Sequence, residues 1–318
     1  MNDSDLIHRA AGIIRQGGVV AFPTETVYGL GAEVFNPLAV ARIFEIKNRP
    51  SFDPLIVHIA ELEEMSRLVV TIPTDARRLI KRFWPGPLTI VLLKKDGVPD
   101  IVTAGLPTVA IRMPRHPIAL RLIKEARCPI AAPSANPFGY VSPTTADHVR
   151  DQLGNQVDLI LDGGPCEVGL ESTIISFSEE KPRLLRPGGL SLEEVESIVG
   201  KIEGNPSDEA KPSSPGRLPK HYAPRTPIII DEWKRNLEAY QSKKVGLLAF
   251  RKVHLSFPFR HVEVLSPVGD LREAAANLFA AIRRLDALNL DLILAEAAPE
   301  VGMGRAIMDR LRRASKRE

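Results

Sequence analysis

KNRPSFDPLIVHI, residues 47–59, joins the end of one predicted helix to a predicted strand. The preceding segment PLAVARIFEIK, residues 37–47, carries apolar side chains at helical spacing, and Pro50 is expected to stop that helix. The following run PLIVHI is short and apolar, as is typical of a buried strand. A helix followed by a stiff loop and a buried strand indicates an α/β fold.

The same alternation continues on both sides of this stretch. Helical spacing begins near Asp3 and returns in PTDARRLIKRFW, PIALRLIKEA, residues 146–153 and LSLEEVESIVG. Strands are predicted for VVAFP, LTIVLLKK, TVAIRMP, PIAAPSA, VDLILDGG, STIISF and RLLRPG. Because several of these strands follow one another with no room for a helix, we predict a mixed sheet.

The chain divides into three predicted regions. Residues 1–202 hold the alternating pattern, and residues 203–227 are too rich in proline, serine and charge to bury a core, which predicts a linker. Residues 228–318 contain three strand-like runs, PIIID, KVGLLAF and DLILAEA, separated by helical stretches. This last region predicts a small parallel α/β domain.

The composition excludes several classes of protein. The 318 residues are 44% hydrophobic and 25% charged, with a net charge of +3, as in ordinary globular proteins. The cysteines, Cys128 and Cys166, form no CxxC pair or zinc-spaced cluster, which argues against a disulfide scaffold or a structural metal. No signal-like or membrane-length apolar run occurs, so we expect a soluble cytoplasmic protein that does not enter membranes.

The segment FPTETVYGLG, residues 22–31, follows a predicted strand and concentrates hydroxyl groups and one carboxylate in a glycine-closed turn. Such groups at a strand end can hold a small polar ligand. The same pattern also suits a strand-to-helix connection capped by threonine. The segment alone leaves both interpretations open.

The charges of the opening stretch also have two interpretations. Lys47 and Arg49 can complement the helix dipole at its C-terminus without any ligand. An arginine fork and a lysine charge on a proline-stiffened loop also match the needs of a polyphosphate. His58 lies in an otherwise apolar strand, where a lone histidine is more often structural.

Two later loops carry further polar side chains. IAAPSANPFGYVSPTTADH, residues 130–148, leads into a helix, so that an anion site and simple N-capping both fit it. GGPCEVGLESTIISF, residues 163–177, lacks the Gly-Lys-Ser/Thr of a P-loop. Its Glu171 suits a general base, a metal ligand or a helix cap equally well.

The C-terminal segment VGMGRAIMDRLRRAS predicts a helix start without a ligand, because Gly302 and Gly304 are not followed by the third small residue of the dinucleotide fingerprint. The basic residues of this helix are predicted to form a solvated face, not an RNA site; they are Arg310, Arg312, Arg313, Lys316 and Arg317.

Taken in order, the motifs resemble those of the threonylcarbamoyl-AMP synthase family, YrdC-like enzymes, in the long form with an additional C-terminal domain. The resemblance is carried by PTETVYGLG, KNRP followed by PLIVH, AIRMP, APSAN with SPTT after it, ESTI, LRPG and SPGRLPKHYAP. It implies a twisted mixed β-sheet domain with a basic concave cleft, a linker lying over that cleft, and a small Rossmann-like parallel α/β domain.

The resemblance also implies a reaction, in which L-threonine, bicarbonate and ATP give threonylcarbamoyl-AMP and pyrophosphate. Mg2+ would accompany the ATP phosphates, with no protein ligand assigned. The product would pass to a tRNA threonylcarbamoyl-transferase complex that modifies an adenosine beside the anticodon. Weak contact with tRNA or other double-stranded RNA would be a secondary property.

Carried over by motif position, the resemblance assigns the site residues. Those for L-threonine are Thr26, His58, Arg112 and Ser172. Those for ATP are Lys47, Arg49, Asp53, Ser134, Asn136, Ser142, Arg186 and Tyr222. Lys47 and Arg49 would also be the catalytic pair, acting by orientation and charge neutralisation.

Two alternatives stay open from the sequence. One is a related carbamoyl-adenylate-forming enzyme, although the larger hydrogenase-maturation proteins of that kind carry cysteine-rich zinc motifs that are missing here. The other is a non-catalytic RNA-binding module, which would bind RNA in a salt-dependent manner without ATP turnover.

Overall fold

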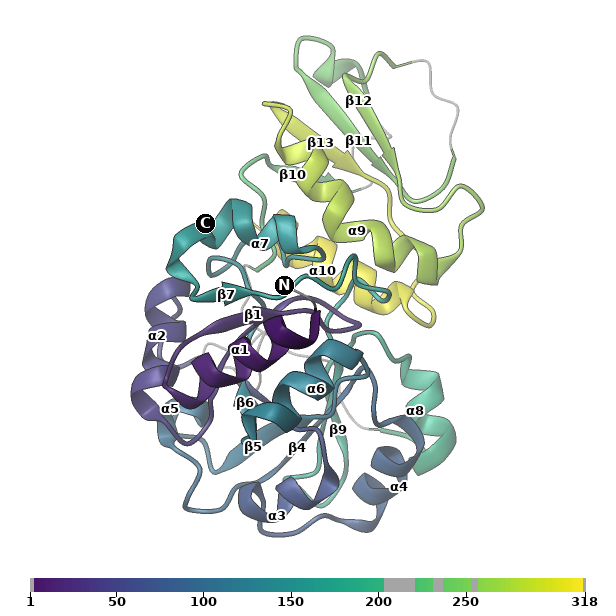
Figure 1. Ribbon diagram of the computed structural model, residues 1–318. Helices are drawn as coiled ribbons and strands as arrows, with labels where there is room; N and C mark the ends of the chain where they lie inside the picture. Colours follow the sequence, from purple (N-terminus) through teal and green to yellow (C-terminus); the bar gives the residue numbers. More distant parts are fainter. Residues whose placement is uncertain (1–2, 203–220, 231–236, 253–256, 317–318) are drawn as a thin grey trace.

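The computed structural model describes residues 3–202, 221–230, 237–252 and 257–316. The structure contains a large sheet and a smaller sheet. The smaller sheet lies beyond one end of the large one, and helix α10 (Gly304–Ser315) lies between them (Figure 1). Most of the expected linker, residues 203–220, lies outside the described residues.

Within the described residues, the large sheet has nine strands in the order β7-β1-β2-β6-β3-β5-β4-β8-β9. The strands are β1 (Val20–Phe22), β2 (Gly29–Glu33), β3 (Ile56–His58), β4 (Leu88–Leu93), β5 (Thr108–Arg112), β6 (Ile130–Ala131), β7 (Leu159–Ile160), β8 (Thr173–Ser176) and β9 (Arg183–Arg186). Three neighbouring pairs are parallel, β1 with β7, β3 with β5 and β4 with β8, and the others are antiparallel. The predicted mixed sheet is therefore confirmed.

Strand β2 was not predicted. Gly29 and Gly31 were expected to close a turn, whereas they pair with Phe22 and Val20 in an antiparallel ladder. The turn lies before them, at Thr24 to Val27, where the Thr24 hydroxyl donates to the Val27 carbonyl. Because glycine is depleted in strands, the composition of GLGAE did not indicate one.

The helices of this part are α1 (Asp3–Arg15), α2 (Pro37–Lys47), α3 (Met65–Leu68), α4 (Thr74–Phe83), α5 (Asp100–Thr103), α6 (Pro117–Ala126), α7 (Ala146–Leu153) and α8 (Leu192–Val199), with 3-10 turns at Leu62–Glu64 and Gly154–Gln156. Helix α2 has the predicted bounds: the Asn36 side chain caps its first turn, and Asn48 ends it with a left-handed φ of 50°. The loop from Asn48 thus leaves the helix in a defined direction toward β3.

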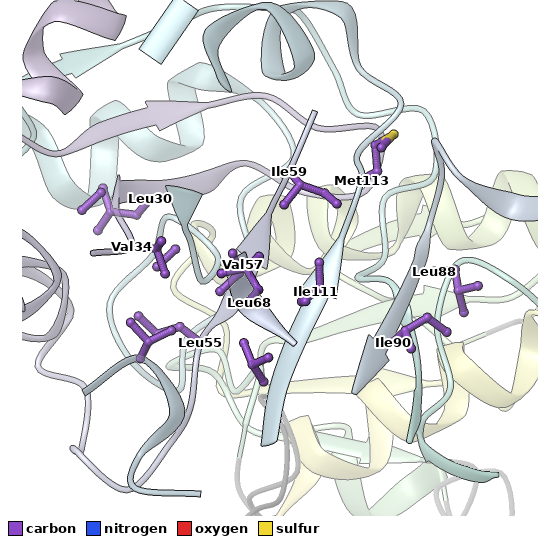
Figure 2. Close-up of a cluster of buried hydrophobic side chains, with 14 of the residues drawn as sticks. Leu30, Val34, Leu55, Val57, Ile59, Leu68, Leu88, Ile90, Ile111 and Met113 are labelled. Atoms are coloured by element: carbon purple, nitrogen blue, oxygen red, sulfur yellow. The ribbon is translucent and has the colours of Figure 1, made fainter. Parts of the chain in front are cut away.

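The strands next to this loop separate a hydrophobic core from a polar face. Val57, Ile111 and Ile90 point into the main core, together with Leu30 and Leu55 (Figure 2). Alternate residues point the other way, where Ile56 and Ala110 belong to a small apolar cluster. Since side chains alternate along a strand, His58 and Arg112 lie on this second face, directly opposite one another in the β3–β5 register.

The second sheet is entirely parallel, in the order β10-β13-β11-β12, within the described residues. Its elements are β10 (Ile228–Ile230), a 3-10 turn at Leu237–Tyr240, β11 (Val245–Ala249), β12 (His261–Val264), α9 (Leu271–Asp286), β13 (Leu292–Ala295) and α10. Three strands were predicted, and β12 makes a fourth. It is an edge strand whose His261 and Glu263 break the apolar run that strand prediction relies on.

Residues of both parts share one hydrophobic cluster. Val27, Val141 and Leu170 of the first part pack with residues of α9 and α10 such as Phe279 and Ile307. No helix among the described residues has both the length and the apolar character needed to cross a membrane.

The predicted solvated basic face on α10 is wrong in part. Arg310 is fully buried and Arg313 is nearly so, whereas Arg312 is exposed and pairs with Glu300. Arg317 lies outside the described residues. Helical spacing places Arg310 and Arg313 on the same face of the helix. The sequence does not show that this face is buried, because arginine is rarely buried without a paired group and its partner cannot be read from the helix alone.

Candidate active site

One cavity opens on the polar face of the large sheet. Eight of the twelve predicted site residues line it: Thr26, Arg49, His58, Arg112, Ser134, Ser172, Arg186 and Tyr222. The other four, Lys47, Asp53, Asn136 and Ser142, lie behind this lining. Their roles as ligand contacts stay predictions.

Arg112 at the end of β5 is held in place by three groups. Its Nη1 donates to the Thr26 hydroxyl at 2.7 Å, and its Nε donates to the Gly86 carbonyl at 3.2 Å. Its Nη2 lies 2.7 Å from a carboxylate oxygen of Glu25. Each Nη still carries a second N–H, so the guanidinium can bind an added carboxylate without leaving these partners.

His58 is neutral at physiological pH in this environment. Burial, with the nearby Arg112 as the next cause, lowers the pKa of its imidazole to about 3. Its Nδ1 is buried and makes no hydrogen bond to the described residues. A neutral imidazole with an unused polar atom can accept or donate one hydrogen bond to a ligand.

Arg49 and Lys47 occupy the loop after α2. The Nη2 of Arg49 lies 2.9 Å from the Asp53 carboxylate and donates to the Pro54 carbonyl at 2.8 Å. The ammonium of Lys47 donates to the carbonyls of Ser134 and Asn136, at 2.6 and 2.5 Å. Lys47 therefore holds the 134–136 loop against the α2 end, and Arg49 alone of the two reaches the cavity lining.

Lys47 is an unusual cation because it is almost completely buried. Burial lowers the pKa of its amine well below the ordinary value, and the neighbouring Arg49 adds to this effect. Asp53 opposes both. The loop thus places two basic side chains beside one carboxylate in a buried region, where an added anion would favour their charged forms.

Ser172 and Arg186 form another wall of the cavity. The guanidinium of Arg186 donates to the Ser172 carbonyl at 2.9 Å and to its hydroxyl at 3.2 Å. The same hydroxyl lies 2.7 Å from that of Thr89 on β4. Arg186, at the end of β9, is thus fixed with respect to β4 and β8.

Glu171 brings a carboxylate into the cavity lining. One oxygen accepts from the Ser142 hydroxyl at 2.5 Å, and the other accepts from Nε of Arg310 at 2.9 Å. Burial alone would raise the pKa of Glu171, but Arg310, Arg186 and the Ser142 hydroxyl outweigh it and hold the pKa below its ordinary value. Glu171 is therefore ionised.

Residues 221–226, here called the strap, form part of the cavity wall through their first two residues. His221 and Tyr222 both line the cavity, and the Tyr222 ring stacks on Phe279 of α9 with centroids 5.5 Å apart. Ala223 donates to the Gly139 carbonyl at 2.8 Å, which ties the strap to the first part of the chain. Tyr222 has a left-handed φ of 62°, an unfavourable conformation for tyrosine that its packing maintains.

Several buried polar atoms at this site have no hydrogen-bond partner among the described residues. They are His58 Nδ1, His221 Nδ1, the Tyr222 hydroxyl and Arg310 Nη2. A buried polar atom without a partner costs about 1–3 kcal/mol, so their concentration here points to a ligand that completes their bonds.

The sequence did not indicate all of the lining. Thr24, Val27, Gly29, Ile56, Ala132, Pro133 and His221 also line the cavity. Glu25 and Thr89 support it from behind. His221 and Thr24 could have been predicted as lining residues, since both lie inside motifs that the sequence analysis singled out. Nothing in the sequence indicated Arg310, because it reaches the site from a helix that lies more than a hundred residues further along the chain.

Buried arginines around a neutral histidine, closed by an aromatic strap, define a protein that binds a small anionic or zwitterionic ligand. Comparison with known proteins agrees with this class. Residues 12–188 match the Sua5/YciO/YrdC family, described as "Telomere recombination", and residues 190–316 match "Threonylcarbamoyl-AMP synthase, C-terminal domain". The chain belongs to this family of threonylcarbamoyl-AMP synthases.

Individual relatives cover nearly the whole chain. The threonylcarbamoyl-AMP synthase of Pyrococcus abyssi is 47% identical over 97% of this chain and 94% of its own length. That of Bacillus subtilis is 45% identical over 97% of this chain and 92% of its own. The crystal structure of P. abyssi Sua5 complexed with L-threonine has a TM-score of 0.92, with 46% identity, 99% of this chain and 95% of that chain covered.

Proposed function

We propose that the chain is an L-threonylcarbamoyladenylate synthase and a nucleotidyltransferase, which joins L-threonine, bicarbonate and ATP into threonylcarbamoyl-AMP and releases pyrophosphate. The observation that carries this proposal is a cavity in which Arg112, His58 and Thr26 meet Arg49, Arg186 and Tyr222 of the strap. The relative with the same fold was crystallised with L-threonine, which supports the amino-acid part.

L-threonine would bind where Arg112 and His58 face each other across β5 and β3. The free N–H groups of Arg112 would pair with the substrate carboxylate. His58, neutral and with an unused Nδ1, and Thr26 would hydrogen-bond the hydroxyl or the amine. Ser172 would complete this pocket.

ATP would bind against the remaining predicted residues. Arg49 and Arg186 would neutralise the phosphates, and the Tyr222 ring would cover the nucleotide. Lys47, Asp53, Asn136 and Ser142 would act from behind, Lys47 by holding the Ser134 loop and Asp53 by holding Arg49. Both proposed catalytic residues would thus act by orientation and charge, Arg49 directly and Lys47 through the loop.

Mg2+ is proposed as the metal that accompanies ATP. The one carboxylate in the described lining, Glu171, is already engaged by Ser142 and Arg310, so phosphate oxygens would be the main ligands. When bound there, the ion would reduce the repulsion between the polyphosphate and an incoming anion.

The chemistry requires two bond-forming steps. The threonine amine attacks the carbon of bicarbonate, or of CO2 formed from it, and water is lost to leave a carbamate. A carbamate oxygen then attacks the α-phosphorus of ATP, and the bond to the β-phosphate oxygen breaks to release pyrophosphate. The cations of the site would stabilise the charge on the phosphates as the second bond forms.

The test is pyrophosphate release by the purified protein with ATP and Mg2+, with threonine and bicarbonate omitted in turn. Release that requires both substrates is expected. Release that is indifferent to threonine, or none with any combination, would contradict the proposal and favour another acyl acceptor.

We further propose that the product passes in the cytoplasm to a tRNA threonylcarbamoyl-transferase complex. RNA contact would be secondary. One observation favours it: basic side chains outnumber acidic ones in a groove beside α1 and α6, where Arg9, Arg121 and Arg127 lie with Asp5 and Glu125. Salt-dependent binding of a tRNA that weakens when these three are replaced by glutamine would support such contact, and salt-independent or absent binding would refute it.

A further inference from the structure

Arg310 of α10 joins the second part of the chain to the cavity. Its side chain is completely buried. Besides Glu171, it donates from Nη1 to the Pro187 carbonyl at 2.9 Å and to Asp309 at 2.6 Å. Its guanidinium carbon lies 5.1 Å from the centroid of the Tyr222 ring. One side chain therefore contacts the Glu171 segment, the loop after β9 and the strap.

These contacts fix the orientation of Glu171. The carboxylate has one oxygen on Ser142 and the other on Arg310, so it cannot rotate without breaking a bond to one of them. The next residue, Ser172, holds Arg186 and lines the predicted threonine pocket. A shift of Glu171 would therefore be transmitted to both predicted substrate regions.

The contacts also fix the strap. The Tyr222 ring contacts both Phe279 of α9 and the guanidinium of Arg310, two groups from the second part of the chain. A ring held by stacking and by a cation keeps its place even though its hydroxyl has no partner among the described residues.

We propose that Arg310 is a positioning residue for the synthase reaction, holding the Glu171 carboxylate and the Tyr222 ring at the cavity from the second part of the chain. This inference rests on the proposed function. It differs from a purely structural role because it makes the ionisation of Glu171 depend on Arg310.

The groups that face Glu171 determine the expected pH dependence. They are Arg310 and its partner Asp309 from α10, Arg186 from β9, Ser142 from its loop and Tyr222 from the strap. Arg310 is the strongest of those that lower the pKa of Glu171. Without Arg310, burial would be opposed only by Arg186 and the hydrogen bonds, so the pKa of Glu171 would rise and the carboxyl would take up a proton at a higher pH than in the parent.

The experiment compares Arg310→Met with Arg310→Lys, measuring kcat/KM for ATP and the ATP dissociation constant by calorimetry from pH 5 to pH 8.5. For Arg310→Met, we expect a loss relative to the parent that grows as the pH is lowered from 8.5 to 5, because the Glu171 carboxyl has lost the cation that most favours its ionised form. Arg310→Lys retains the charge, so its smaller loss should not vary with pH. The matched control is Arg312→Met, an exposed arginine on the same helix, which should behave like the parent.

A loss in Arg310→Met that is the same at every pH would overturn the proposal and leave Arg310 a structural residue. If Arg310→Met does not fold, Glu171→Gln decides: unchanged kcat/KM and ATP affinity in that variant would refute the positioning role. A parent that binds ATP but releases no threonine-dependent pyrophosphate would contradict the proposed function only, because the calorimetric comparison still tests Arg310.

Discussion

At the scale of single residues, the site depends on buried charges whose partners are also buried. Arg49 is the clearest case, because Asp53 beside it is completely buried. Removing one member of a buried pair leaves the other without compensation, at a cost of about 3–5 kcal/mol. Alanine at position 49 would therefore destabilise the fold as well as slow the reaction, and a variant that keeps the charge separates the two effects.

We predict that Arg49→Lys lowers kcat/KM for ATP by roughly 10- to 100-fold with little change in the melting temperature. The lysine keeps a positive charge near Asp53 but loses the planar fork that can bind two oxygens at once. Steady-state kinetics and thermal unfolding measure the two effects. Arg42→Lys, in a more exposed pair with Asp158, is the control and should leave both unchanged. A large fall in melting temperature with normal kinetics would show that Arg49 is structural.

The second residue prediction concerns His58. Its pKa is about 3 in the folded protein and about 6.5 when unfolded, so the unfolded chain binds a proton between these values and the folded one does not. Stability is therefore lost as the pH falls from about 6.5 toward 3, by about 1.4 kcal/mol per pH unit at most. His58→Gln should make unfolding less sensitive to acid, as measured by denaturant titrations at pH 7, 5.5 and 4.5. The exposed His8→Gln is the control, and an unchanged acid slope in His58→Gln would contradict the low pKa.

At the scale of elements, apolar periodicity predicted most of the large sheet and its helices. The predictions for α2, α6 and α7 have the observed bounds, because proline or polar caps mark their starts and their apolar faces are regular. Strands β2 and β12 were missed. The glycines of β2 and the charged residues of β12 hide the apolar pattern by which a strand is predicted. The conformation of both segments is determined by the strands with which they pair, not by their own side chains.

The candidate site was predictable where its residues lie in short local motifs. Thr26, Arg49 and His58 are found in motifs that also mark chain turns. Arg310 and Glu25 were not assigned, because their role arises from pairs that form only when distant segments pack together. Such pairs form only when distant segments come into contact in the folded protein. A single sequence does not show which segments those are.

One element-scale prediction concerns the turn after β9. A Cβ on Gly188 would lie 2.3 Å from the Glu171 carbonyl oxygen and 2.4 Å from the backbone of Ser172. We expect Gly188→Ala to push this turn away from the 171–173 segment, lowering the melting temperature and reducing kcat/KM for both substrates. Gly97→Ala, where nothing lies within 4 Å, is the control. Normal activity in Gly188→Ala would mean that the segment yields without disturbing Glu171.

At the scale of the whole molecule, the two parts of the chain are held together by polar bonds as well as by their shared hydrophobic cluster. Asp286 of α9 accepts from the Tyr140 hydroxyl at 2.5 Å and from the backbone N–H of Thr226 at 2.7 Å. Arg283, on the same helix, donates to the Val141 carbonyl and to Gln152. Helix α9 thus holds the loop of Ser142 and the strap together. We expect the two parts to unfold in one cooperative transition.

The prediction for the whole molecule uses Gly169, which lies directly against α9. A Cβ there would be 2.5 Å from the backbone of Ala276. We predict that Gly169→Ala separates the two parts, so that calorimetry shows two transitions and ATP affinity falls. Gly164→Ala is a close control, because Gly164 has a similar positive φ of 76° but nothing within 4 Å of the added methyl. A single transition with unchanged ATP affinity in Gly169→Ala would refute the coupling.

The pair formed by Glu171 and Arg310 also has a consequence for synthesis on the ribosome. The two residues are 139 positions apart, so at about 5–20 residues per second the carboxylate is made roughly 7–28 s before its cation. During that interval the large sheet can begin to fold, but Glu171 lacks the arginine that orients its carboxylate and Tyr222 lacks the helix that holds its ring. A nascent chain would therefore pass through a stage with a formed cleft and an unfinished site.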